Sequence, residues 1–551
     1  MSLLFTWTLV MALFALPACA ADRWLARRGV TDERVRLAAP LALAGVLGYV
    51  AFFVYFLHPE LGRAFAVAVP VASAAYLVRS RREPRPARIP SNLRLLALLG
   101  FGIGLFYLAL LYLPDLSRPP ETQSQVRFLY EFPMDSNLPL LLGDRLYAGE
   151  SPKPFLPEAG WLSSDRPPLQ AGLYLLVRPW LTVFGQAPGL GYQCVGTLAQ
   201  LCWLPALWLV GRRLELDRAR LMALLGLAAA TGLLLFNSTY VWPKLLAGGY
   251  VLIAALLWLD RSAPRPPVIA ALAATCAALG WLAHGAAAFS LLPLGLLLLL
   301  PRLFPGWRNV LAAALVFAVL SAPWTAYQKF YDPPANRLMK WHLAGVIPID
   351  SRTTWEAIRD AYSGLPPGML LANKRANFGT LINGSFLSAA DVFTTAAYPR
   401  KVDEFFYVFR SLGVLNLAWI LAPAAWLLRR RLPPRFGLQA SVLGWTALTL
   451  AFWTLALFNP ASTILHSSSY AMMLGLLGLA LVFLLQLPRW LGLPVLGWHL
   501  LGFALTWLPY YHSAPLDPVM IVLVVFAGAG VGAVLFRAAT RKSDAPSSPP
   551  V

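Results

Sequence analysis

The chain alternates between long apolar runs and short polar turns. A helix of about 20 apolar residues is long enough to cross the hydrocarbon core of a bilayer. The pattern therefore predicts an all-α polytopic membrane protein with about fifteen transmembrane helices. We expect these helices over residues 3–20, 37–57, 64–78, 95–113, 190–210, 221–236, 245–259, 268–282, 286–300, 310–326, 409–428, 437–458, 464–487, 493–511 and 516–536.

Two long polar stretches interrupt this pattern, and they are where chemistry is expected. The first, residues 131–170, reads EFPMDSNLPLLLGDRLYAGESPKPFLPEAGWLSSDRPPLQ, and the second spans residues 327–408. The apolar stretch 169–185 follows the first, but Arg178 and Pro179 interrupt it. It is therefore predicted to be a helix lying at the membrane interface.

The distribution of arginine predicts the orientation. The sequence is 58% hydrophobic and 13% charged, and soluble domains carry about 25% charged residues. The net charge of +20 could indicate a nucleic-acid partner, but the arginines cluster in short turns such as 79–94. Positive short turns face the cytoplasm, so no nucleic acid is expected. The N-terminus and both polar stretches are then periplasmic, and the C-terminus is cytoplasmic, with a disordered tail over 538–551.

Asp135 is the first candidate for chemistry. Leucines recur at helical spacing after it, which predicts a short amphipathic surface helix that begins near Asp135. One interpretation is a helix N-cap, the commonest structural role of Asp in that position. The other is an ionised carboxylate at the membrane face that orients or deprotonates a hydroxyl or holds a metal.

The second candidate is the segment from Asp165 to Leu169, which reads Asp-Arg-Pro-Pro-Leu. A residue before proline avoids the helical region, so the prolines hold Asp165 and Arg166 in an extended conformation. A surface ion pair at a helix start explains the segment equally well. The functional interpretation is a carboxylate and a guanidinium presented rigidly to a phosphorylated substrate.

Further ionisable side chains fall at the predicted outer face. Each can simply extend to the interface, but several at one depth favour a binding role. No nucleophile motif, glycine-rich phosphate loop or metal-ligand spacing accompanies them, which disfavours a nucleotide-dependent enzyme. These positions are Lys244, His284 and His466, and within the second polar stretch Lys329, Arg337, Lys340, Trp341 and His342.

The order of these features resembles the GT-C superfamily of membrane glycosyltransferases, in particular the branch with the protein O-mannosyltransferases and the lipid A aminoarabinose transferase. The resemblance rests on Asp135 after a helix that exits to the periplasm, on Asp165-Arg166-Pro167-Pro168-Leu169, and on the closing Val183-Phe184-Gly185. It covers roughly residues 95–535. The family often has an acidic residue where this chain has Lys244, and Lys-Gly where it has His284-Gly285.

The resemblance implies a glycosyltransferase that moves a sugar from a polyprenyl-phosphate-linked donor to a periplasmic lipid, glycan or protein acceptor, within a bacterial inner membrane. Asp135 and Asp165 would be the catalytic carboxylates. A divalent cation is possible at Asp165 and His284. The expected substrate-binding residues are Arg166, Lys244, His284, Glu131, Tyr147 and His466.

The resemblance also divides the chain. Residues 1–94 form three extra helices and a basic loop, 95–326 a GT-C-like core with its first periplasmic loop at 114–185, 327–408 a periplasmic loop domain, and 409–537 the C-terminal helices. Two alternatives remain. An O-antigen ligase or polymerase would depend on Arg337 and His342, with Asp135 dispensable. A transporter or flippase for a lipid-linked substrate would need charges buried in mid-membrane and an internal repeat.

Overall fold

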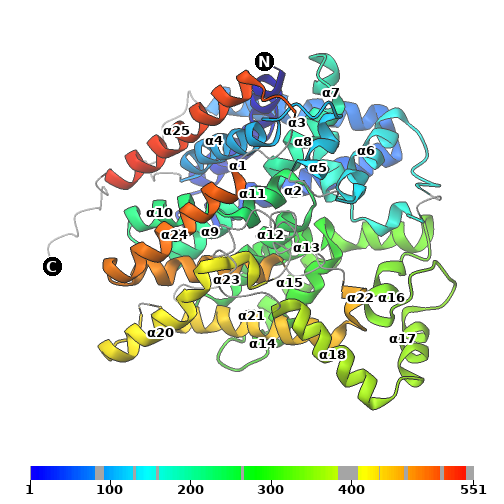
Figure 1. Ribbon diagram of the computed structural model, residues 1–551. Helices are drawn as coiled ribbons and strands as arrows, with labels where there is room; N and C mark the ends of the chain where they lie inside the picture. The colour runs from blue at the N-terminus through cyan, green and yellow to red at the C-terminus, as the bar shows by residue number, and fades with distance from the viewer. Residues whose placement is uncertain are drawn as a thin grey trace.

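The computed structural model describes residues 2–80, 92–127, 132–156, 160–261, 266–382, 408–433, 435–463, 470–508 and 514–541. Within these ranges every regular element is a helix, and strand pairing is limited to two isolated bridges, Pro114–Leu516 and Leu156–Trp161. Most long helices lie along roughly the same axis (Figure 1), with the loop helices α6 (Leu138–Ala148), α16 (Arg337–Ala344) and α17 (Thr354–Ser363) together at one end. This is the arrangement of a multi-pass membrane protein.

Ten helices of the described residues are long and apolar enough to cross a membrane, or eleven if one bent pair is counted as a single span. The ten are α1 (Ser2–Arg27), α2 (Glu33–Leu57), α3 (Pro59–Arg79), α4 (Leu93–Leu111), α8–α9 (Pro188–Arg213), α15 with its π-helical end η7 (Trp307–Tyr331), η10–α20 (Arg410–Arg429), α21 (Phe436–Ala456), α24 (Arg489–Trp507) and α25 (Pro518–Thr540).

The prediction of about fifteen spans is thus too high by this length criterion. The remaining predicted spans correspond to the bent pair and to shorter apolar helices of 10–17 residues. The shorter helices are α12 (Lys244–Leu259), α13 (Pro267–Ala283), η6–α14 (Gly285–Leu298) and α23 (Tyr470–Gln486). Hydropathy alone cannot distinguish such a helix from a full span, because both are uniformly apolar.

The bent pair replaces the single helix predicted over residues 221–236. Helix α10 (Arg218–Ala229) and helix α11 (Gly232–Thr239) meet at 59°. Thr231 lies at the break, and its hydroxyl accepts a hydrogen bond from the Leu234 N–H at 3.4 Å. A threonine cap followed by Gly232 starts a new helix instead of continuing the old one.

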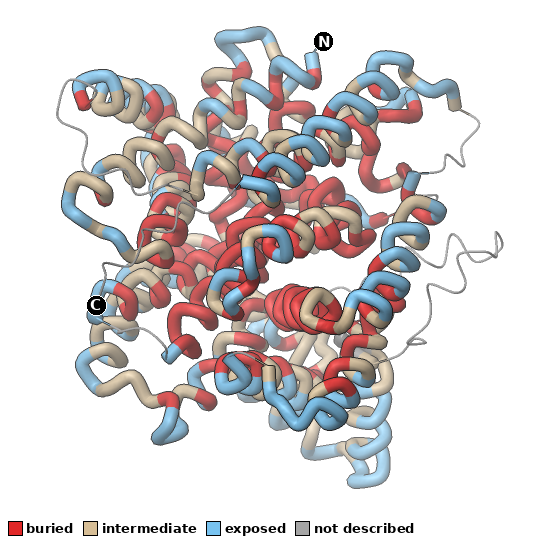
Figure 2. Tube along the Cα trace, turned by 90° about the vertical axis from the view of Figure 1, so that its left-hand side faces the viewer, coloured by how far each residue is buried: buried red, intermediate tan, exposed pale blue. Residues whose placement is uncertain are grey.

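Helix α12 is the centre of the fold. All of its residues are buried, and it packs against α9, α13 and α23. Figure 2 shows the buried segments gathered in the interior with exposed helices around them. Because α12 begins at Lys244, a helix that is buried throughout starts at a residue predicted to bind substrate.

The first three helices pack directly on the rest of the protein. Helix α2 lies along α7 (Leu169–Val183), and a Cβ added at Gly172 of α7 would lie 2.0 Å from the Gly48 carbonyl oxygen of α2. Only glycine allows two helix backbones to approach so closely. The helix expected over residues 169–185 is present as α7, and α2, α3, α6 and α8 cover it and leave most of it buried. Its expected position at, or dipping into, the outer interface stays a prediction.

The polar loops gather at one end. The first contains η2 (Pro120–Thr122), α5 (Gln123–Val126), η3 (Met134–Asn137), α6 (Leu138–Ala148) and η5 (Ser163–Asp165), and the second contains α16 (Arg337–Ala344), α17 (Thr354–Ser363) and α18 (Pro367–Ile382). The four-residue α22 (Pro460–Thr463) also lies on this side, next to α16 and α18. Both polar stretches singled out in the sequence therefore contribute to the same end of the molecule (Figure 1).

Candidate functional site

Asp135 lies in η3, one turn before α6. The residue that precedes α6 is Asn137, and its side chain makes no capping hydrogen bond. The Oδ2 of Asp135 instead accepts a hydrogen bond from the Nη2 of Arg166 at 2.5 Å. The capping interpretation of Asp135 is therefore wrong, because its carboxylate faces the second motif of the loop and not the backbone of α6.

Asp165 is the buried partner of a second arginine. Its Oδ2 accepts hydrogen bonds from the Leu162 N–H at 2.9 Å and from the Nη1 of Arg337 at 3.1 Å. Only 1% of the Asp165 side chain is exposed, against 23% for Asp135. Burial raises the pKa of the Asp165 carboxyl, against the opposing effects of the Leu162 N–H and of Arg337. Of the two carboxylates, Asp135 is the one that a substrate can reach.

Trp161 lies between the two arginines. Its ring centroid is 4.4 Å from the guanidinium carbon of Arg166 and 4.8 Å from that of Arg337. The Nε atoms of both arginines are buried and have no hydrogen-bond partner in the described part of the chain. Two nearly buried guanidinium groups held against one indole form a site suited to an anion. Both arginines were predicted separately and Trp161 was not, since nothing in the sequence indicates that they share one ring.

The residues that follow α15 form hydrogen bonds to the turn that carries Asp165. The Oδ2 of Asp332 accepts hydrogen bonds from the Ser163 hydroxyl at 2.6 Å and from the Ser164 N–H at 3.1 Å. The Ser163 hydroxyl also contacts the Tyr327 hydroxyl at 2.6 Å, and Gln328 donates to the Ser164 carbonyl at 3.0 Å. These contacts fix the turn that carries Asp165. The sequence gives no signal for them, because they join residues more than 160 positions apart.

A buried hydrogen-bond network of glutamine amides and a tyrosine hydroxyl holds the turn that follows Asp135. The Nε2 of Gln170 donates to the Tyr192 hydroxyl at 2.8 Å, and that hydroxyl donates to the Ser136 carbonyl. Gln200 donates to the Oε1 of Gln170 at 3.0 Å and accepts from the Leu246 N–H at 2.9 Å. A fully satisfied buried network of this kind holds its members in one arrangement. It connects the turn after Asp135 to the first turn of α12.

Lys244 and His284 line one small pocket together with Tyr470 and Gly248. Lys244 is buried, with its Nζ 3.4 Å from the centroid of the Trp242 ring. The charges of Arg166 and Asp135 both reach Lys244. The Nδ1 of His284 accepts a hydrogen bond from the Ala286 N–H at 3.1 Å. The structure thus brings Lys244 close to the arginine site and places His284 beside it.

Tyr147 belongs to a different cluster. It lies near the far end of α6, about 13 Å along the helix from Leu138. Its hydroxyl is 3.2 Å from that of Thr182, and its ring contacts Arg63 and Arg178 at 4.7 and 4.4 Å. Tyr147 is therefore not brought together with Asp135. Two other predicted substrate-binding residues, Glu131 and His466, fall outside the described residues.

The predicted cation sites fit poorly. Within the described ranges, no group of three or more His, Cys, Asp or Glu side chains is arranged to hold a metal ion. Asp165 faces the guanidinium of Arg337, and His284 shares its pocket with Lys244. The positive charge of Arg337 opposes the binding of a cation at Asp165, and the Nδ1 of His284 already accepts from the Ala286 N–H. The donor groups present at these two positions do not suit a divalent metal.

The fold and the site define a multi-pass, all-helical membrane protein with a double-arginine site at one end. No protein-family model matches the sequence, and no curated protein matches it either. Among solved structures, the chain is similar to the archaeal oligosaccharyltransferase AglB from Archaeoglobus fulgidus, which was solved in complex with an inhibitory peptide and a dolichol-phosphate. The TM-score is 0.36 and the identity 14%, over 81% of this chain and 55% of AglB. The chain thus spans about half the length of AglB, and a likeness of this size carries no functional argument.

Proposed function

We propose that this protein is a membrane glycosyltransferase of the GT-C type, which moves a sugar from a polyprenyl-phosphate-linked donor to an acceptor at the periplasmic face of a bacterial inner membrane. The observation that carries the proposal is the pair of arginines, Arg166 and Arg337, on one tryptophan ring next to the accessible carboxylate of Asp135.

The arginine site suits the phosphate of the donor. A guanidinium presents several N–H donors in a fixed plane that matches phosphate oxygens, and it stays charged at every physiological pH. The Nε atoms of Arg166 and Arg337 are buried, and the 9% of each side chain that is exposed is the part a phosphate can contact. Lys244 lies within electrostatic range of Arg166 and Asp135, and its Nζ is a further N–H donor beside the two guanidinium groups. These groups would stabilise the negative charge that develops on the phosphate as it leaves.

The reaction needs one base. The acceptor hydroxyl oxygen attacks the anomeric carbon of the sugar, and the bond between that carbon and the phosphate oxygen breaks. The proton of the hydroxyl passes to the carboxylate of Asp135, and the bonding electrons leave with the polyprenyl phosphate. Asp135 is the carboxylate for this role because it is accessible, whereas Asp165 is buried and positions Arg337.

The orientation of the protein is part of the proposal. The arginine-rich turns favour a periplasmic N-terminus, a cytoplasmic C-terminus and periplasmic loops that carry Asp135 and Arg337. If the bent pair and the shorter apolar helices also cross the bilayer, the number of spans approaches the fifteen that the sequence suggests. A polyprenyl chain is anchored in the same bilayer, so the donor can reach such a site by lateral diffusion.

One observation also favours the ligase-like alternative. Arg337, on which that alternative depends, is within the candidate site and bonded to Asp165. Its loss would impair either enzyme, so Arg337 cannot discriminate between them. Asp135 can, because a ligase of that kind would not need it.

The test is transfer by the purified protein in proteoliposomes that contain a synthetic polyprenyl-phosphate sugar with an isotopic label. Extracts of membranes supply the acceptor, and mass spectrometry locates the label. We expect label in a glycolipid, glycan or glycoprotein with the polyprenyl-phosphate donor and none with a nucleotide sugar. Transfer from the nucleotide sugar alone, or release of intact donor to the other leaflet without transfer, would overturn the proposal.

A further inference from the structure

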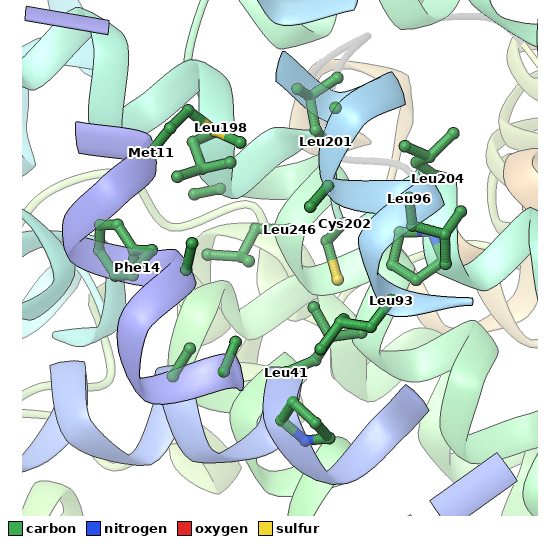
Figure 3. Close-up of a pocket in the computed structure, with 18 of the residues that line it drawn as sticks. Met11, Phe14, Leu41, Leu93, Leu96, Leu198, Leu201, Cys202, Leu204 and Leu246 are labelled. Carbon is green, nitrogen blue, oxygen red and sulfur yellow. The ribbon is translucent and has the colours of Figure 1, made fainter. Parts of the chain in front are cut away.

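An apolar cavity of about 180 Å³ lies between α1, α2, α4, α7, α8, α9 and α12, and none of its lining residues belongs to the arginine site. Figure 3 shows Met11 and Phe14 of α1, Leu93 and Leu96 of α4, and Cys202 converging on it. Tyr250 supplies its principal polar group, and the Tyr250 hydroxyl donates to the Leu41 carbonyl at 2.8 Å. Water needs several polar partners to occupy a cavity, so an apolar ligand fits this one better.

The cavity interrupts tight packing. Gly100 and Gly104 lie one turn apart on α4. A Cβ added at Gly104 would lie 2.3 Å from the Trp7 ring, whereas one added at Gly100 would meet nothing nearer than Leu204, at 3.9 Å. Protein interiors are normally packed to crystal density. Helix α4 is thus tightly packed at Gly104 and open at Gly100, one turn away, which indicates room for a ligand beside Gly100.

The end of the cavity nearest the start of α4 is basic. The lining residues Ala18, Leu37 and Leu93 adjoin charged segments of α1, α2 and α4. Arg94 is exposed there and lies within electrostatic range of Cys19. The adjoining segments carry six arginines, Arg23, Arg27, Arg28, Arg34, Arg36 and Arg94, against Asp22, Asp32 and Glu33. Arg34 and Arg36 form ion pairs with Asp32 and Asp22, and Glu33 pairs with Arg212, so the remaining excess at this end is positive.

We propose that this cavity holds part of one acyl chain of an anionic phospholipid, with the lipid phosphate near Arg94. The cavity supplies the apolar surface for the chain, and the basic end supplies the charge for the headgroup. Phospholipids are the abundant molecules with both features at this depth of a bilayer. The bound lipid would join α1 and α2 to the core. This inference does not depend on the transferase activity.

The test compares lipid retention in two variants of the full-length protein. Gly100→Leu fills the cavity, and Gly295→Leu adds the same side chain on exposed α14, where a Cβ meets nothing within 4 Å. Native mass spectrometry after purification in mild detergent reports bound lipid. We expect one anionic phospholipid on the wild type and on Gly295→Leu, and at least a tenfold lower occupancy on Gly100→Leu. Equal occupancy in all three proteins, or a polyprenyl phosphate as the bound lipid, would overturn the proposal.

A measurement on the wild-type cavity covers the case in which Gly100→Leu does not fold. Cys202 lines the cavity, so its alkylation by N-ethylmaleimide reports occupancy. After delipidation, vesicles of phosphatidylglycerol should slow the alkylation of Cys202 at least fivefold, vesicles of phosphatidylcholine should slow it much less, and Arg94→Ala should remove the difference. Equal protection by both vesicles, or by neither, contradicts the assignment.

Discussion

Replacing Arg337 by Met is expected to destabilise the protein much more than replacing Asp165 by Asn, although the two side chains form one ion pair. Arg337→Met leaves a carboxylate that is only 1% exposed, with the Leu162 N–H as its remaining hydrogen bond. Removing one partner of a buried pair in this way costs about 3–5 kcal/mol. We therefore expect a loss of about 3 kcal/mol of unfolding free energy at pH 7.

Asp165→Asn has two opposing effects. It removes the attraction to Arg337, but it also removes a charge whose burial is costly, as the raised pKa of Asp165 indicates. Arg337 keeps its contact with the Trp161 ring, a cation–π interaction of about 0.5–2 kcal/mol. The expected loss of unfolding free energy is below about 1 kcal/mol.

The double variant measures the pair itself. At 3.1 Å and an effective dielectric constant of 20, Coulomb's law gives about 5 kcal/mol as an upper bound for the attraction. After solvent screening, we expect a coupling free energy of about 2–3 kcal/mol between the two substitutions. The assay is equilibrium unfolding in mixed detergent micelles, followed by tryptophan fluorescence. Additivity within about 0.5 kcal/mol, or an Asp165→Asn variant less stable than Arg337→Met, would refute the reasoning.

Three further predictions concern the ring, the pH dependence and the helix crossing. Trp161→Leu should raise the donor KM about tenfold at unchanged protein level, because both guanidinium groups lose the ring that aligns them; an unchanged KM removes Trp161 from the site. Burial raises the pKa of Asp165. As the medium is acidified, transfer should therefore begin to decline at a higher pH than it would if this aspartate were exposed. The same shift makes the contribution of Asp165 to folding less favourable as the pH rises from its unfolded pKa through its folded pKa. In Asp165→Asn the acid limb of the pH–rate profile should lie at a different pH, and a limb unchanged in that variant assigns it to another group. Gly172→Ala should lower stability by about 2 kcal/mol or more in thermal unfolding, because the added Cβ meets the Gly48 backbone, whereas Gly368→Ala meets nothing and should be neutral.

The apolar pattern predicted most helices to within a few residues. Helix α2 was expected over residues 37–57 and covers Glu33–Leu57, and α21 was expected over 437–458 and covers Phe436–Ala456. The pattern did not predict which apolar helices are enclosed by others. Helix α12 and a lipid-facing helix look alike in composition, since lipid and protein interior are both apolar. The burial of α7 likewise depends on Gly48, which lies more than a hundred residues away.

The sequence indicated the charged residues of the candidate site but not the contacts between them. Asp135, Asp165, Arg166 and Lys244 were found because charges are conspicuous in an apolar chain. Trp161 was missed because an aromatic residue is not conspicuous there. Contacts between segments that are distant in the sequence become visible only in the folded chain.

The most direct test of the central claim is sugar transfer by membranes that carry Asp135→Asn, with Asp144→Asn as the matched control. Both aspartates belong to the same loop segment, and each is paired with an arginine, Arg166 for Asp135 and Arg178 for Asp144. If Asp135 is the base, Asp135→Asn should lower kcat at least a hundredfold, the lower limit for a general base, at normal protein level. Asp144→Asn should stay within about threefold of the wild type, because α6 places it about 9 Å or more beyond Leu138. Wild-type turnover by Asp135→Asn would contradict the account.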